Sequence, residues 1–101
     1  MLHIKQLFAI SIKFWRKKMD SLIGQIVLFA GNFAPHGWAL CNGQLLSIQE
    51  YTAVYSILGT TFGGDGVQTF ALPNLPIVPD TDGKGESRYI ICLYGIYPSR
   101  W

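Results

Sequence analysis

The sequence predicts an α+β fold, a compact and mostly antiparallel β unit with one short helix. Three observations predict it. Apolar runs of strand length recur at residues 23–30, 38–41, 69–72 and 89–94. Residues 48–58 carry apolar side chains at helical spacing. Clusters of Gly, Pro and Asn separate these segments, and a chain of 101 residues is long enough for one small domain.

The first expected strand, residues 23–30, is apolar on both faces. Ile26 and Leu28 point to one side and Val27 and Phe29 to the other, while Gln25 is nearly alone in its polarity. Such a strand is either central in its sheet or covered by a neighbouring subunit. Residues 31–37, which follow, are rich in turn formers and are expected to form a loop.

The pair Asn42-Gly43 predicts a β-hairpin between the apolar runs at residues 38–41 and 45–46. Both central residues of a type I′ turn need positive φ, which Asn tolerates and Gly adopts without strain. Asn42 and Gly43 are therefore expected to have a structural role in this turn.

A capping box predicts that the helix begins at about Ile48. Ser47 and Glu50 have the S-x-x-E spacing, in which the hydroxyl accepts from a first-turn amide and the carboxylate reaches back to the cap amide. Gly59 is expected to end the helix as its left-handed residue. The apolar stripe consists of Ile48, Tyr51, Tyr55 and Leu58, with Val54 at its edge.

The glycines of residues 59–66 are interpreted as conformational. Phosphate-binding loops follow a strand and open a helix, whereas this loop follows a helix and leads into the strand expected at residues 69–72. Beyond it, three prolines predict an extended connector, and residues 80–86 predict a solvated surface loop, with a partial calcium loop as the alternative. Residues 89–94 predict a closing strand, and Gly95 a bulge or a close backbone approach.

Composition limits the classes of function. Half of the residues are apolar and 14% are charged, which excludes a disordered chain and suggests apolar surface shared with a partner. The net charge of +2 arises from basic residues before position 20, and the remainder is acidic, so no nucleic-acid partner is expected. Cys41 and Cys92 lie in apolar runs and are expected to be buried free thiols, with a cross-strand disulfide as the alternative.

The chain divides into a basic leader, residues 1–18, and a domain, residues 19–101. Lys5 and Lys13 interrupt the apolar residues of the leader, so no stable membrane insertion is expected. The functional interpretation of the leader is an amphipathic helix on a membrane surface. We expect instead that translation starts at Met19.

Residues 23–75, about half of the chain, resemble the phage tail collar domain. The motifs that carry the resemblance are GQIVLFAGNFAPHGWALCNGQLL, LGTTFGGDG and TFALPNL. This family includes bacterial proteins described as microcystin-dependent and the collar regions of short tail fibres. The resemblance implies a structural or adhesive component of a phage tail or tail-like particle, made in the bacterial cytoplasm and acting outside the cell in host attachment.

The resemblance also implies partners. These are further copies of the chain in a homo-oligomer, with trimers known among fibre relatives, other tail or fibre proteins, and a cell-surface glycan. A free-standing carbohydrate- or receptor-binding module is the alternative function.

No catalytic, metal or cofactor site is expected. The sequence has no H-x-H or H-E-x-x-H motif and no nucleophile elbow, and the capping box accounts for Glu50. A small enzyme that uses His36 or Glu50 remains the least favoured class. Exposed aromatic residues suit sugar rings, so the candidate binding residues are Phe33, His36 and Trp101. Trp38 and Phe62 are expected in the core, and the residues given structural roles are Trp38, Asn42, Gly43, Ser47, Glu50 and Gly59.

Overall fold

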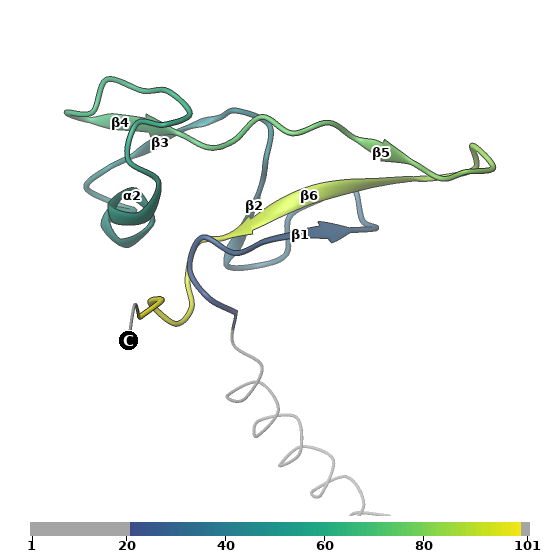
Figure 1. The fold of residues 1–101 in the computed structure, drawn as a ribbon, viewed down its shortest axis with the longest axis horizontal. Helices are drawn as coiled ribbons and strands as arrows, with labels where there is room; N and C mark the ends of the chain where they lie inside the picture. Colours follow the sequence, from purple (N-terminus) through teal and green to yellow (C-terminus); the bar gives the residue numbers. More distant parts are fainter. Residues whose placement is uncertain (1–20, 100–101) are drawn as a thin grey trace, which may run out of the picture.

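The structure is a computed structural model that describes residues 21–99. Its elements, in order, are strands β1 (Ile26–Phe29), β2 (Trp38–Leu40) and β3 (Leu45–Ser47), helix α2 (Thr52–Leu58), and strands β4 (Thr69–Ala71), β5 (Val78–Pro79) and β6 (Glu86–Cys92) (Figure 1). Every pair of these strands is antiparallel, so the predicted α+β class is confirmed. The leader, residues 1–18, lies outside the described residues.

Strand β6 is the centre of the larger sheet. β1 runs along one side of it, with Ile26 opposite Ile91. β2 runs along the other side, with Ala39 also opposite Ile91, and β5 pairs with the beginning of β6. β6 starts earlier than the sequence predicted, because the turn at residues 80–85 folds β5 back onto it. In that turn the Asp80 amide donates to the Gly85 carbonyl at 2.8 Å.

The hairpin predicted at Asn42-Gly43 is wrong. β2 pairs with β6, whereas β3 pairs with β4 in a separate two-stranded sheet. Asn42 does not have the positive φ of a type I′ turn, and its side-chain oxygen instead accepts from the Gln44 amide at 3.2 Å. Gly43 does have positive φ (79°), and its amide donates to the Pro73 carbonyl. This pair therefore carries the chain from one sheet to the other.

Helix α2 begins at Thr52, later than predicted. The Ser47 hydroxyl does accept from the Glu50 amide at 3.4 Å, but this bond lies in a separate turn that precedes the helix. Tyr51 occupies the cap position with non-helical angles (φ −124°, ψ 49°) and makes no side-chain cap bond. Because β3 is paired with β4 up to Ser47, the chain must first turn away from the sheet. Gly59 ends the helix with positive φ, as predicted, but its ψ of −144° lies outside the left-handed helical region.

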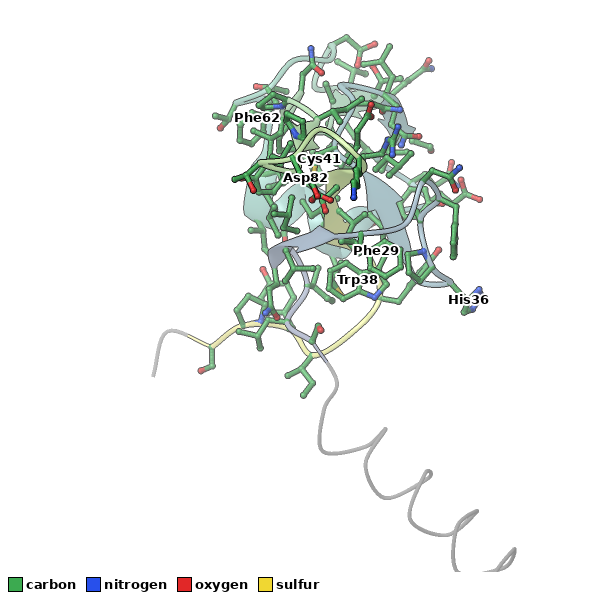
Figure 2. The ribbon with its side chains drawn as sticks, turned by 90° about the vertical axis from the view of Figure 1, so that its right-hand side faces the viewer. Phe29, His36, Trp38, Cys41, Phe62 and Asp82 are labelled. Atoms are coloured by element: carbon green, nitrogen blue, oxygen red, sulfur yellow. The ribbon has the colours of Figure 1, made fainter. Side chains whose placement is uncertain are left out.

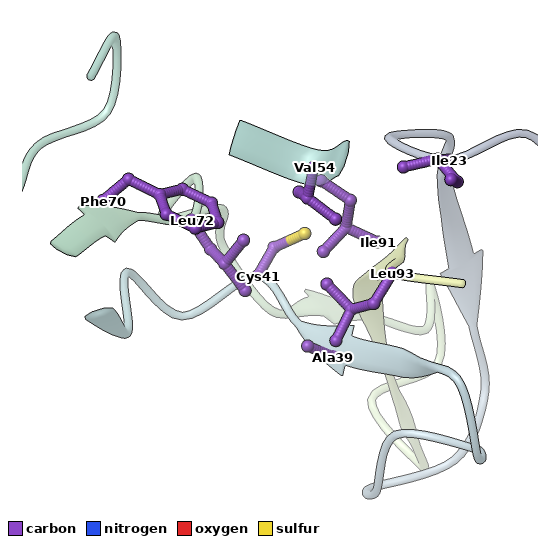
Figure 3. Packing of buried hydrophobic residues seen from close by; sticks show 8 residues of the cluster. All are labelled: Ile23, Ala39, Cys41, Val54, Phe70, Leu72, Ile91 and Leu93. Atoms are coloured by element: carbon purple, nitrogen blue, oxygen red, sulfur yellow. The ribbon is translucent and has the colours of Figure 1, made fainter. Parts of the chain in front are cut away.

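The core joins the two sheets through α2 (Figure 3). Val54 is 1% exposed and is the most buried residue of the helix, so the centre of the stripe lies at Val54 and not at its predicted edge. Phe70 of β4 and Ile91 of β6 are fully buried. The buried cluster comprises Ile23, Ala39, Cys41, Val54, Phe70, Leu72, Ile91 and Leu93.

Two further expectations have clear outcomes. Cys41 and Cys92 are both buried, and neither is in a disulfide, so the disulfide alternative is wrong. They lie on opposite faces of the sheet, because Cys41 is two residues from Ala39 on the core side, while Cys92 is one residue from Ile91. The conformational role of the glycine loop is confirmed, since Gly63, Gly64 and Gly66 all have positive φ.

Candidate functional site

Strand β1 is an edge strand, so the first of the two expectations for it, a central position, is wrong, and cover by a neighbouring subunit stays a prediction. Among the described residues its only strand partner is β6. The Cys92 amide donates to the Gln25 carbonyl at 2.9 Å, and bonding alternates along an antiparallel pair. The amides and carbonyls of Ile26 and Leu28 consequently face the open side. The side chains of both residues are exposed, by 38% and 49%.

Exposed apolar side chains continue from this edge onto the helix and the C-terminal segment. Leu22 forms a bridge with Ile96, and a Cβ placed on Gly24 would lie 3.3 Å from the Ile57 side chain. The hydroxyls of Tyr97 and Ser56, the neighbour of Ile57, are 2.7 Å apart. We call this region the apolar surface, and it consists of Leu22, Ile26, Leu28, Ile57, Ile96 and Tyr97.

The apolar surface has the chemistry of a protein interface. Its members are aliphatic or aromatic and none is charged. It also contains an open strand edge, which can pair with another extended segment. Clusters of this kind on a folded protein mark places where another molecule binds.

The structure places Phe33 and His36 in the loop between β1 and β2. Phe33 is 59% exposed and packs edge-on against Phe29, with ring centroids 5.7 Å apart. His36 is exposed and points away from the body of the protein (Figure 2). Trp101, the third candidate, lies outside the described residues.

The expectation that Trp38 and Phe62 lie in the core is wrong. Phe62 is 47% exposed, and Trp38 is half-buried at the start of β2, apart from the buried cluster. Phe70 fills the core position instead, with its ring 5.4 Å from that of Tyr55. The spacing of these aromatic residues in the sequence could not show which of them is buried, because their burial depends on how β3 and β4 pair.

Sequence reasoning missed a cleft beside β6. It has a volume of about 230 Å³ and lies where β2 leaves β6 and the connector before β5 approaches. Arg88 borders it and forms an ion pair with Glu86 at 3.2 Å. The lining residues are Leu40, Cys41, Asn42, Leu75, Pro76, Ile77, Arg88 and Tyr89. Three separate segments contribute to these walls, so no local sequence pattern could have revealed the cleft.

The shifted pKa values have structural causes. The amides of Thr69, Val67 and Gln68 donate to the Asp65 carboxylate and lower its pKa to about 2. Burial raises the pKa of the Cys41 thiol to about 11. Nothing in either environment activates a nucleophile or a general acid.

Residues 21–99 hold neither a candidate metal site nor a candidate membrane span. In that part of the chain, no group of three His, Cys, Asp or Glu side chains is placed to hold a metal ion. No helix there is long and apolar enough to cross a membrane.

Comparison with known proteins gives one match. The family model described as the Phage Tail Collar Domain matches residues 24–77, just over half of the chain. No curated protein and no solved structure matches the chain. The matched residues include β1, the Asn42-Gly43 pair, α2 and the glycine loop.

Proposed function

This chain belongs to the phage tail collar domain family, and we propose that it acts at the host-contacting end of a phage tail or tail-like particle, as a collar or fibre-tip protein that takes part in attachment. The family is a structural one and not a family of enzymes, so the protein is a structural component of the virion tail. Its part in attachment and its assembly into a homo-oligomer are our proposal.

The observation that supports assembly is the apolar surface. One copy leaves Leu28, Ile96 and Tyr97 about half exposed beside an open strand edge. Covering such groups with a partner is favourable by a free energy of about 25 cal/mol for each Å² of apolar area removed from water. Subunits that fold and assemble together bury surfaces of this type, because obligate interfaces resemble a domain core cut in two.

Light scattering at low and high ionic strength tests the assembly. The wild-type protein is expected to have an oligomeric mass in both conditions, because salt screens exposed charges and leaves apolar contacts intact. Leu28→Lys adds a charge to the open edge and is expected to reduce the mass. Val67→Lys is the matched control, because Val67 is 79% exposed and lies outside the apolar surface. A wild-type protein that is monomeric at micromolar concentration, at both low and high ionic strength, would refute the proposed assembly.

Adsorption of particles to host cells tests the attachment. Purified protein is expected to compete with particles for cells, and Phe33→Ala together with His36→Ala is expected to weaken that competition, since both side chains are exposed in one loop. Mass spectrometry of purified particles provides the second readout. Protein that binds cells but is missing from particles would instead identify the free-standing binding module.

A further inference from the structure

The cleft beside β6 is a preformed hollow with fixed walls. The Leu75 amide donates to the Cys41 carbonyl at 2.8 Å, which holds the connector against the end of β2. Pro73 and Pro76 fix the backbone of the connector on either side of this bond. A ligand would therefore lose little free energy to ordering of the walls.

The volume of the cleft limits the size of the ligand. About 230 Å³ holds roughly eight waters at the liquid volume of about 30 Å³ each. This is below the range of about 300–1,000 Å³ typical for larger ligands, and it suits a single six-membered ring with its substituents.

The lining is amphipathic. Leu40, Leu75 and Ile77 supply apolar walls, and Tyr89 supplies an aromatic side chain. The polar part of the lining comes from Arg88, whose guanidinium offers only hydrogen-bond donors, and from Asn42, whose side-chain amide both donates and accepts. A ligand that satisfies this lining has an apolar face together with groups that both donate and accept.

We propose that this cleft binds one uncharged pyranose ring of a host-surface glycan, an inference that rests on the proposed role in attachment. The C–H face of such a ring packs on apolar and aromatic side chains. Its neighbouring hydroxyls each donate and accept, which matches the donors of Arg88 and the side-chain amide of Asn42.

The charges of the protein around the cleft favour an uncharged sugar over an anionic one. Residues 21–99 contain two basic side chains, Lys84 and Arg88, against five acidic ones. Arg88 is already paired with Glu86, whose carboxylate would repel a ligand carboxylate placed beside it. A bulky apolar side chain from another tail protein fits less well, because it would desolvate the ion pair without replacing its hydrogen bonds.

Nuclear magnetic resonance of the full, isotope-labelled chain tests the inference. The probes are the methyl α-pyranosides of glucose, galactose and mannose, with glucuronate as the charged comparison. At least one neutral sugar is expected to shift the amide signals of Leu75, Ile77 and Tyr89 with millimolar affinity, and glucuronate is expected to bind more weakly. The inference is refuted if no neutral sugar shifts these signals, if shifts occur only in residues 31–37, or if glucuronate binds best.

Two variants locate the binding. Ile77→Glu places a charge at a half-exposed wall position, and Arg88→Met removes the donors but keeps the side-chain stem. Each is expected to weaken binding by about tenfold or more. Val67→Glu, the control at a distant exposed position, is expected to leave binding unchanged. Full binding by the Ile77 and Arg88 variants would overturn the inference.

Adsorption of particles carrying Ile77→Glu separates this inference from the proposed function. Sugar binding at the cleft with unimpaired adsorption would retain the cleft as a sugar site and remove it from attachment. Competition for cells by wild-type protein that binds none of the sugars would retain the attachment role and refute the cleft as a pyranose site.

Discussion

Gly64→Ala is expected to destabilise the protein far more than Gly83→Ala, although both glycines have positive φ, of 94° and 73°. Both substitutions place an L-residue in a backbone region that costs about 1–2 kcal/mol. Both also lower the conformational entropy of the unfolded chain, which offsets about 0.4–1 kcal/mol of that backbone cost. The shared net cost is therefore about 1 kcal/mol.

The two positions differ in the space available for a methyl group. At Gly83 an added Cβ meets nothing within 4 Å. At Gly64 it would meet the backbone of β4, 2.6 Å from the Thr69 carbonyl oxygen and 2.8 Å from the Phe70 nitrogen. That backbone cannot move away freely, because Phe70 is fully buried in the core. Overpacking of this kind costs about 1–3 kcal/mol in addition.

Urea unfolding followed by circular dichroism measures the difference. The free energy of unfolding is expected to fall by about 1 kcal/mol for Gly83→Ala and by about 2–4 kcal/mol for Gly64→Ala. All three proteins should be compared at one concentration, since association adds to the apparent stability. Equal losses for the two variants would show that β4 does not approach the glycine loop as described.

Three further predictions concern the Ser47 turn, Asp65 and the thiols. Ser47→Ala is expected to lower the free energy of unfolding by about 0.5–1 kcal/mol in the same urea assay. Glu50→Gln should change nothing, because the backbone amide of Glu50, which this substitution leaves in place, donates to the Ser47 hydroxyl. The pKa of Asp65 is lowered from 3.8 to about 2. The stability that its charged carboxylate contributes is therefore complete above about pH 4 and is lost as the pH falls towards 2. The melting temperature of the wild type should exceed that of Asp65→Asn by less and less in that window, and a constant difference would contradict the charge effect. Cys41 and Cys92, both buried, are expected to react with a thiol reagent at pH 8 only after urea is added, and rapid labelling of the folded protein would mean that one of them is accessible.

Local signals predicted local structure well. The strand at residues 69–72, the end of the helix at Gly59 and the conformational role of the glycine loop depend on backbone preferences that act over a few residues. The expected class of fold also followed, because alternation and helical spacing report burial directly.

Pairing between distant segments could not be predicted in the same way. Asn42-Gly43 favours a hairpin locally, yet β2 gains more by pairing with β6 and β3 by pairing with β4. Because β6 pairs with β2 on its other side, β1 is left at an edge of the sheet, although the sequence of β1 suits a central strand. The cleft depends on those pairings, so its residues were visible in the sequence and their proximity was not.

The central place of β6 determines when the larger sheet can form. β1, β2 and β5 all precede β6 in the chain, and each pairs with β6 and with no other strand among the described residues. During synthesis on the ribosome, the first strands therefore leave the exit tunnel long before the strand that joins them. Contacts between such distant segments slow folding and leave apolar strands uncovered in the meantime. Nascent chains that end before residue 86 should accordingly depend on chaperones, and released full-length chains should fold by a slow step in which β6 inserts between β1 and β2.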